Sequence, residues 1–350
     1  SVRAEGNFYT SDGKPYLITG GIPSVQNGSK LSMYVTYTYT CNPAPGETPI
    51  TGYYTAETGA ALPPIQCLDG RTVVGWLNTT SGLSTGGKVW KSIPAGTTGN
   101  LTFGLDETKS YAGVKLFNVT GNKITSLTNE GKALSVINIP EGVEEIGVDV
   151  FNGNTTVTTV ILPSTLQTIG LRSFYGCTAL SNLSLPSALK TIGNAAFSGC
   201  TSLNNNPFPS NSELISLGGA SFSNTGLTNI VIPNGVTEIQ SNTFAACPLT
   251  SVSLPSMLTK IGSQAFDSCA NLTSITIPAS VTEIGTLAFR SCGTAPVPGH
   301  FTITMQRANP PTLGSSVFSG VQSLTVRVKA ADKPTYENDP SWSSFIYNTY

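Results

Sequence analysis

The stretch from Leu180 to Cys200 reads Leu-Ser-Asn-Leu-Ser-Leu-Pro-Ser-Ala-Leu-Lys-Thr-Ile-Gly-Asn-Ala-Ala-Phe-Ser-Gly-Cys, and variants of it recur from Ile137 to Cys292. One proline marks each of seven repeats at intervals of 22 to 24 residues: Pro140, Pro163, Pro186, Pro209, Pro233, Pro255 and Pro278. A phenylalanine column follows in the same phase: Phe151, Phe174, Phe197, Phe222, Phe244, Phe266 and Phe289. A fixed period of this size predicts a solenoid, in which each unit buries its apolar face by stacking on its neighbours.

Each position of the repeat has a local interpretation. Leu183 and Leu185 share one face of a short strand because strand side chains alternate. Pro186 ends that strand, since proline has no N–H for a continuing ladder. Gly193 is expected at a corner where a left-handed backbone is needed. The Asn-Ala-Ala-Phe stretch at 194–197 is expected to form one turn of α- or 3₁₀-helix.

The repeat also resembles a known family. The run Leu-x-x-Leu-x-Leu is the core of a leucine-rich repeat, and Pro-x-x-Leu-x-x-Ile-Gly-x-x-Ala-Phe-x-x-Cys is similar to the BspA-like subclass. That subclass has 23-residue repeats and occurs on bacterial and protist cell-surface proteins. The resemblance implies a mainly β fold with short helical or 3₁₀ turns, arranged as a right-handed leucine-rich repeat solenoid. A small β-rich module is expected to precede it.

The expected domains follow from where the repeats begin and end. Residues 1–110 form the β-rich module, and residues 111–350 form the solenoid. Within the solenoid we expect an N-terminal cap at 111–136, seven repeats at 137–292 and a C-terminal cap at 293–350. The segment from Thr302 onward is similar to the closing segment of such arrays in Bacteroides-type proteins, and Phe318 and Trp342 are expected to cover the last core face.

The N-terminal third has its own pattern. Residues 33–41, Met-Tyr-Val-Thr-Tyr-Thr-Tyr-Thr-Cys, alternate as a strand does. Residues 70–76, Gly-Arg-Thr-Val-Val-Gly-Trp, resemble the end of a Listeria–Bacteroides repeat, which implies a small β-grasp-like module over about 31–103.

Composition limits the function classes. Only 11% of the residues are charged, and the net charge of −1 gives no electrostatic case for nucleic acid or an anionic membrane. No apolar run approaches the ~20 residues of a transmembrane helix. The abundance of Ser, Thr, Asn and Gly favours an exported protein at the cell surface or outside the cell. The first residues lack a Met and an apolar signal core, so we expect that an export signal or lipid anchor has been removed.

The seven cysteines do not indicate a metal site. Five of them occupy one repeat position and form a column rather than a cluster: Cys177, Cys200, Cys247, Cys269 and Cys292. No Cys-x-x-Cys pair is present, although zinc sites favour such pairs. Buried, inert thiols are therefore expected in the repeats. Cys41 and Cys67 lie in the N-terminal module, where either a disulfide or two thiols fits the sequence.

No catalytic arrangement stands out. The single histidine, His300, lies in a Pro-Val-Pro-Gly-His loop and is expected to be solvated. A glycosidase-like carboxylate pair would have to come from Glu144, Glu145, Glu238 and Glu283, but these share the repeat position before the Ile, together with Lys260. Stacking predicts a surface ladder of alternating charges there. We expect no enzyme activity, no catalytic residue, no cofactor and no bound metal.

The strand residues that face away from the core are the candidate binding site, on the concave face of a leucine-rich repeat. They are Asn138, Ile161, Asn182, Ser184, Asn229, Val231, Ser251, Ser253, Ser274 and Thr276. The resemblance implies adhesion, or interaction with a protein on a host or neighbouring cell or in the matrix. The alternative is glycan binding by N-terminal aromatics: Tyr34, Tyr37, Tyr39, Tyr53, Tyr54, Trp76 and Trp90.

Overall fold

The computed structural model describes residues 113–295 and 299–350 throughout. Of the residues before 113 it describes 8–9, 15–16, 36–41, 50–55, 60–62, 65–67, 69–73, 76–78, 89–93, 101–104 and 111–112. The chain divides into two compact units, one of residues 1–67 and 71–113, the other of residues 68–70 and 114–350. The domain boundaries expected from the sequence, 1–110 and 111–350, remain a prediction.

The first unit contains small β-sheets. Its main sheet has the order β4-β3-β11-β8-β9, formed by Ile50–Thr55, Thr36–Cys41, Leu101–Gly104, Trp76–Asn78 and Val89–Trp90. In this sheet β3 and β11 pair in parallel, and the β-grasp-like character of the module stays a prediction. Three smaller groups are β1-β2 (Phe8–Tyr9, Pro15–Tyr16), β10-β5 (Ser92–Ile93, Ala60–Ala61) and β12-β7-β6 (Tyr111–Ala112, Thr72–Val73, Ile65–Gln66).

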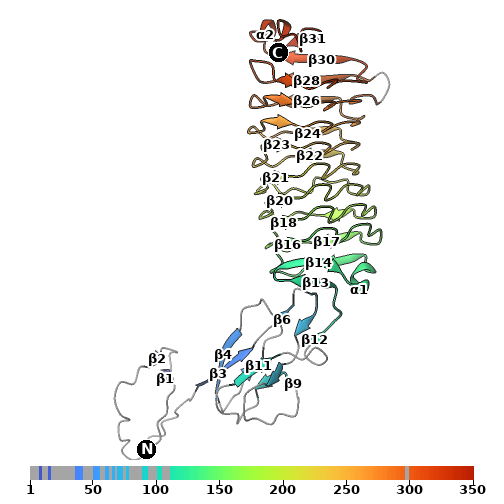
Figure 1. The fold of residues 1–350 in the computed structure, drawn as a ribbon. Coiled ribbons are helices and arrows are strands. Elements are labelled where there is room, and N and C mark those ends of the chain that lie inside the picture. Colours follow the sequence, from blue (N-terminus) through green and yellow to red (C-terminus); the bar gives the residue numbers. More distant parts are fainter. Residues whose placement is uncertain are drawn as a thin grey trace, which may run out of the picture. The chain divides into compact units, whose positions relative to one another are not determined.

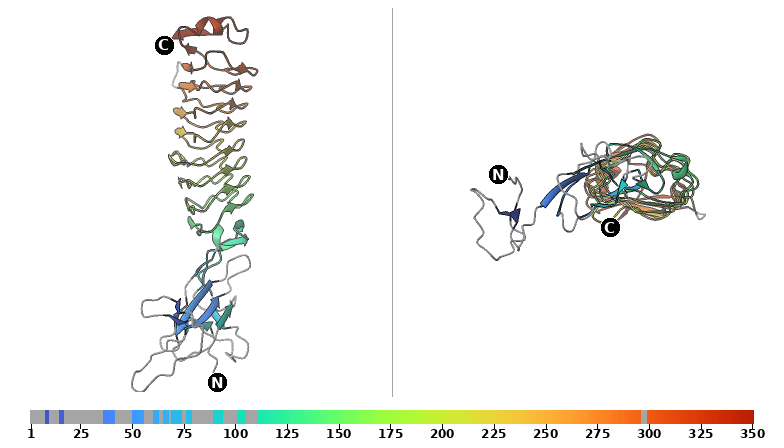
Figure 2. Two further views of the ribbon diagram at one scale, coloured as in Figure 1. Left: turned by 90° about the vertical axis from the view of Figure 1, so that its left-hand side faces the viewer. Right: turned by 90° about the horizontal axis from the view of Figure 1, so that it is seen from below.

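The second unit is a stack of coils (Figures 1 and 2), and most of the coils have two short strands and a turn segment. It is mainly β, and the strands of successive coils pair in parallel. The first strands of the coils are β15 (Val136–Asn138), β17 (Thr159–Ile161), β19 (Asn182–Leu183), β22 (Asn229–Val231), β24 (Ser251–Ser253), β26 (Ser274–Ile277), β28 (Phe301–Met305), β30 (Leu324–Val328) and β31 (Ile346–Thr349).

The second strands run along another side of the coils. They are β14 (Lys123–Leu127), β16 (Glu145–Ile146), β18 (Thr168–Ile169), β20 (Thr191–Ile192), β21 (Ser216–Leu217), β23 (Glu238–Ile239), β25 (Lys260–Ile261), β27 (Glu283–Ile284) and β29 (Thr312–Leu313). At the start of the stack, β13 (Phe117–Thr120) pairs antiparallel with β14, and helix α1 (Asn129–Lys132) follows.

The phenylalanine column is the spine of the core. All seven repeat phenylalanines are buried, and their rings stack with centroids 4.6 to 5.9 Å apart. Phe318 continues the column, 5.9 Å from Phe289. Because each ring from Phe174 to Phe289 lies between two others, removing one of these rings leaves a cavity with two walls.

The turn segments form a ladder of their own, which we call the turn ladder. Each segment donates three alternate backbone N–H groups to the next coil, over seven steps, with N···O distances of 2.6 to 3.0 Å. In the first step, the N–H groups at 149, 151 and 153 bond the carbonyls at 171, 173 and 175. All donors point toward the C-terminal end of the stack, so the peptide dipoles of the ladder are aligned.

The backbone of the turn ladder alternates between right- and left-handed conformations, so the expected turn of α- or 3₁₀-helix at 194–197 is wrong. A helix needs successive residues of one hand, but here the first and third donors have a positive φ. These donors are Asp149 and Gly153, Arg172 and Gly176, Ala195 and Gly199, Ala220 and Asn224, Asn242 and Ala246, Gln264 and Ser268, and Leu287 and Ser291. Ser316 and Gly320 hold the same two positions, with the same positive φ, in the last turn segment, where the described structure shows no ladder bond from their N–H groups. Every non-glycine residue with a positive φ in the described chain lies at one of these two positions.

Gly193 is needed for space rather than for handedness, which corrects its expected role. Its φ is not positive, and the positive φ falls two residues later, on Ala195. A Cβ on Gly193 would lie 2.6 Å from the backbone of Gly170 in the preceding coil. The glycine therefore allows neighbouring coils to approach closely at this corner.

The fourth repeat lacks a first strand. Pro207 and Pro209 lie at the position of the first strand that would stand between β19 and β22. No strand is formed there in the described structure. One ladder bond survives, from the N–H of Leu185 to the carbonyl of Pro207 at 2.9 Å. Because proline donates no N–H, the sheet of first strands is interrupted at this coil.

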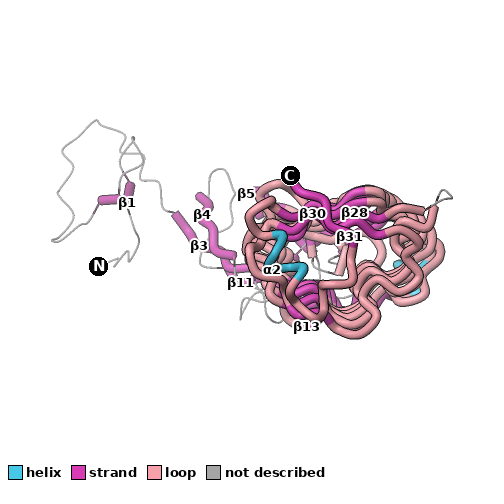
Figure 3. The backbone as a smooth tube through the Cα atoms, turned by 90° about the horizontal axis from the view of Figure 1, so that it is seen from above, coloured by secondary structure: helices cyan, strands magenta, loops and turns pink. Residues whose placement is uncertain are grey.

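The C-terminal end of the stack is covered by aromatic residues. Residues 301–320 form one more coil, and α2 (Lys333–Glu337) and β31 follow it (Figure 3). Trp342 is fully buried, packs edge-on against Phe318 at 6.4 Å and donates its indole N–H to the carbonyl of Pro311. Tyr336 is also buried. These contacts cover the last face of the core.

Candidate functional site

The candidate binding residues lie on the outward side of the first strands, which we call the first-strand face. Alternation along each strand places one or two apolar residues in the core and their neighbours outside. All ten predicted residues are exposed: Asn138, Ile161, Asn182, Ser184, Asn229, Val231, Ser251, Ser253, Ser274 and Thr276. Their exposure follows the pattern, but their role in binding stays a prediction.

The strand register shows which of these residues are neighbours. Asn138 is paired with Ile161 in the first group of strands. In the second group Asn229 is paired with Ser251, and Val231 with Ser253. The strandless fourth repeat separates these two groups. Strand β26, which carries Ser274 and Thr276, lies beside β24 but pairs with β28, so it extends the second group. The structure therefore brings the predicted residues together as two patches rather than one row.

The chemistry of the first-strand face is hydroxyl, amide and small apolar. Among the described first strands, Arg327 is the only charged residue, and its guanidinium lies 5.6 Å from the ring centre of Tyr350. Val136, Ile161 and Val231 are each more than half exposed. A nearly uncharged surface of this kind binds through contact area and hydrogen bonds, with little electrostatic steering.

The sequence prediction omitted the C-terminal part of this face. Thr302 and Thr304 on β28 lie in register with Ser274 and Thr276 on β26. His300 is exposed, and its ring nitrogens lie 2.9 Å from Ser323 Oγ and 3.1 Å from Thr302 Oγ1. The histidine therefore joins the hydroxyl groups of two neighbouring coils. Extending the inward–outward alternation of the strand residues to 301–305 would have predicted that these threonines face outward.

The carboxylates form part of a charge ladder on the second strands, as the repeat position predicts. Lys260 is in register with both Glu238 and Glu283, and its Nζ lies 2.8 Å from Glu283 Oε1. The hydrogen bond to Glu283 raises the pKa of Lys260. Lys123 makes a second pair with Glu145 at 2.7 Å. These groups neutralise one another along an exposed strand.

The repeat cysteines are buried and bonded to the backbone. The thiols of Cys177, Cys200, Cys247, Cys269 and Cys292 lie 3.0 to 3.2 Å from the carbonyl of a phenylalanine in the preceding coil. In the fourth repeat Thr225 occupies this position, and its Oγ1 lies 3.0 Å from the carbonyl of Phe222 in its own coil. Burial raises the pKa of the Cys247, Cys269 and Cys292 thiols. They are therefore neutral and poorly nucleophilic near pH 7.

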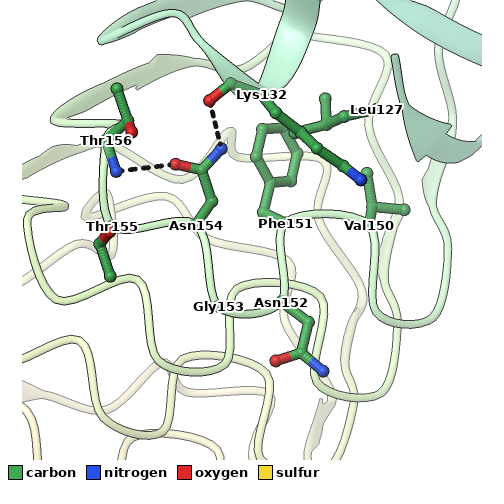
Figure 4. Close-up of a pocket in the computed structure, with 9 residues that line it drawn as sticks. All are labelled: Leu127, Lys132, Val150, Phe151, Asn152, Gly153, Asn154, Thr155 and Thr156. Carbon is green, nitrogen blue, oxygen red and sulfur yellow. Dashed lines mark hydrogen bonds between the residues drawn. The ribbon is translucent and has the colours of Figure 1, made fainter. Parts of the chain in front are cut away.

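A pocket of about 280 Å³ opens beside α1 and the first turn segment (Figure 4). Leu127, Val150 and Phe151 form its apolar wall, and Lys132 extends its side chain across Phe151 toward Val150. Asn154 donates its Nδ2 to the carbonyl of Lys132 at 3.2 Å and accepts from the N–H of Thr156 at 2.9 Å. The repeat pattern does not predict this pocket, because it lies where a short helix replaces a turn segment.

The side chains of the aromatic residues proposed for glycan binding lie outside the described residues. Their backbones show that Tyr37 pairs with Tyr54 and Trp76 with Trp90. Glycan binding by these residues stays a prediction. The side chain of Cys41 also lies outside the described part, so both states of Cys41 and Cys67 remain open.

Neither described helix, α1 nor α2, has the length and apolar character required to span a bilayer.

Comparison with known proteins identifies the repeat. The sequence model of the BspA type leucine-rich repeat region matches residues 122–248 and 237–330, with 6 copies. These ranges together cover more than half of the chain. No curated protein matches the sequence.

Several solved structures are similar in part. A leucine-rich repeat protein from Bacteroides ovatus has 24% identity and a TM-score of 0.48, over 67% of this chain and 74% of that one. The leucine-rich repeat protein of T. pallidum has 27% identity and a TM-score of 0.42, over 61% and 90%. A leucine-rich cell surface protein from Faecalibacterium prausnitzii has 22% identity and a TM-score of 0.41, over 61% and 73%.

Proposed function

The chain belongs to the BspA-type leucine-rich repeat family, and from that membership we propose that it is a non-enzymatic surface or secreted protein that adheres to protein partners. Leucine-rich repeats generally mediate protein interactions, and the stack offers a long repeated surface for this purpose. The low charge and the polar, uncharged composition fit a protein that works outside the cell. The partner is a protein of a host cell, a neighbouring cell or the surrounding matrix.

The observation that supports the proposal best is the exposed first-strand face. Its ten predicted residues are all exposed, and Ile161 and Val231 present apolar side chains that are 53% and 54% exposed. Exposed aliphatic residues within a field of hydroxyl and amide groups suit a protein surface of modest affinity. Two patches on one stack also allow two weak contacts to act together.

The test begins with partner capture. The immobilised full chain is exposed to extracellular-matrix and mucin extracts, and retained proteins are identified and purified. Binding of each partner is then measured for the triple variant Ser184→Lys, Ser253→Lys and Thr276→Lys. These side chains are exposed, so folding should change by less than ~0.5 kcal/mol per site. Three added charges on an uncharged face should abolish binding.

A matched control carries the same charges on the other strands. Thr168→Lys, Thr191→Lys and Ser216→Lys change the second-strand side, where charged ladders already occur. This variant should bind the partner as the wild type does. If the first variant folds and binds normally, or if both variants lose binding equally, the first-strand face is not the site.

A further inference from the structure

The turn ladder has an unpaired edge at its N-terminal end. In seven coils the carbonyls at alternate positions of the turn accept N–H groups from the preceding coil. The corresponding carbonyls of the first coil belong to Val148, Val150 and Asn152, and no donor in the described structure reaches them. We call these three groups the carbonyl edge.

The missing donors are explained by the start of the stack. Where a preceding coil would place its turn segment, the chain instead forms α1, which spans four residues. The hydrogen bond from Asn154 Nδ2 to the carbonyl of Lys132 links α1 to the first turn. The space left between them is the pocket of about 280 Å³ (Figure 4).

The three residues of the carbonyl edge differ in exposure. Val150 is only 5% exposed, whereas Val148 is 48% exposed and Asn152 is exposed, and no donor in the described structure reaches any of the three carbonyls. Backbone carbonyls are nearly always paired, with protein, with solvent or with another molecule. A group that enters the pocket and donates hydrogen bonds would satisfy this requirement.

The direction of the ladder defines the chemistry of that group. All peptide units of the ladder are aligned, so the carbonyl edge is their negative end, comparable to the C-terminus of a helix. Lys132 places a positive side chain beside this end. The pocket therefore presents a row of acceptors with one neighbouring cation.

We propose that the carbonyl edge and its pocket bind a short segment of a partner protein. The segment donates alternate backbone N–H groups to Val148, Val150 and Asn152, and an acidic side chain or a terminal carboxylate lies beside Lys132. Backbone donors occupy the same row of acceptors seven times in this chain, at 2.6 to 3.0 Å. The recognition mode is the addition of a peptide to an open backbone edge.

The site is separate from the first-strand face. It lies in the turn segment of the first coil, whereas the first-strand face lies on strands that begin at β15. Charges placed on the first-strand face should therefore leave this site intact, and loss of one binding activity does not entail loss of the other.

Selective isotope labelling gives a direct test. Val-Phe occurs twice in the sequence, at 150–151 and at 317–318. Full-length protein labelled with ¹³C-carbonyl valine and ¹⁵N phenylalanine should therefore give two correlations. One reports the unpaired carbonyl of Val150. The other reports the carbonyl of Val317, which accepts the N–H of Phe289 at 3.0 Å and serves as an internal control.

The probe copies a turn of this chain. Acetyl-Asn-Ala-Ala-Phe-Ser-Gly-Glu reproduces residues 194–199 and ends in glutamate, which supplies the carboxylates for Lys132. Residues 195, 197 and 199 are donors in the ladder, so N-methylation at the three matching positions gives a control peptide without those N–H groups. Each peptide is titrated to millimolar concentration.

The unmodified peptide should move the Val150 carbonyl resonance downfield and leave Val317 unchanged. The N-methylated peptide should move neither. Lys132→Ala should weaken binding by about 2- to 5-fold, as for an exposed ion pair, whereas Lys190→Ala on the second-strand side should not change it. The proposal would be overturned if the Val150 resonance did not move, or if both peptides produced equal shifts. It would also be overturned if a glycan, chitotetraose, produced the shift and the peptide did not.

Discussion

Replacing Ala246 with glycine should stabilise the protein, the reverse of the usual effect of this change. Ala246 has a φ of 58° and an exposed side chain, and its N–H donates to the carbonyl of Asp267 at 2.7 Å. The left-handed conformation costs an L-residue about 1–2 kcal/mol. Glycine avoids this cost but loses about 0.5–1 kcal/mol through its freer unfolded chain. The expected net gain is about 0.5–1 kcal/mol.

Two further variants make the magnitude interpretable. Ala245 precedes Ala246 in the chain, is 8% exposed and is not among the residues with positive φ. Ala245→Gly should therefore cost about 1–2 kcal/mol, from glycine entropy and one lost buried methyl group. Gly199 has a φ of 79° and its nearest neighbour would lie 3.4 Å from an added Cβ. Gly199→Ala should cost about 0.5–1 kcal/mol, because the handedness cost of about 1–2 kcal/mol is partly offset by the less flexible unfolded chain.

The assay is equilibrium unfolding in urea, followed by circular dichroism, with the three variants compared under one condition. Opposite signs for Ala246→Gly and Ala245→Gly are the decisive result. If both substitutions destabilise by the same amount, the backbone of the turn segments does not alternate in hand as described.

The remaining predictions concern the core. Gly193→Ala should cost about 1–3 kcal/mol in urea unfolding because its Cβ would lie 2.6 Å from the Gly170 backbone; an unchanged midpoint would mean that the coils are not in such close contact. Phe244→Ala should cost ~3–5 kcal/mol, and more than Phe318→Ala, since Phe318 is partly exposed near the end of the stack; equal losses would contradict the stacked spine. The repeat thiols should resist a maleimide until the protein is unfolded, and mass mapping of a disulfide among them would refute the buried column. Burial raises the pKa of Cys269 in the folded protein. The contribution of this thiol to the free energy of unfolding is therefore fully present below the ordinary thiol pKa of about 8.5 and falls as pH rises above it. Cys269→Thr should lose less stability between pH 7 and pH 10 than the wild type.

Much of the core could be predicted from the sequence because its signal is periodic. The proline and phenylalanine columns indicate where strands end and which rings stack, and the structure has these rings in one column. The outward residues of the first strands follow from simple alternation. Pro207 also indicates that the fourth repeat lacks its first strand, since proline cannot continue a strand ladder.

The turn ladder could not be predicted in this way. Arg172, Gln264 and Leu287 have left-handed backbones, although their residue types do not favour that conformation. Hydrogen bonds to the next coil stabilise them, and such bonds appear only when coils are stacked. The carbonyl edge has the same origin, because an unpaired group is recognised only by comparing the first coil with the later ones.

Hydrogen exchange of the phenylalanine amides tests the stacked turn ladder most directly. In ¹⁵N-phenylalanine protein, the N–H groups of seven residues are bonded to the next coil: Phe151, Phe174, Phe197, Phe222, Phe244, Phe266 and Phe289. The N–H of Phe318, in the last turn segment, has no acceptor in the described structure. The seven amides should be strongly protected and Phe318 should exchange much faster. Rapid exchange of the middle residues, or protection of Phe318 equal to theirs, would contradict the account.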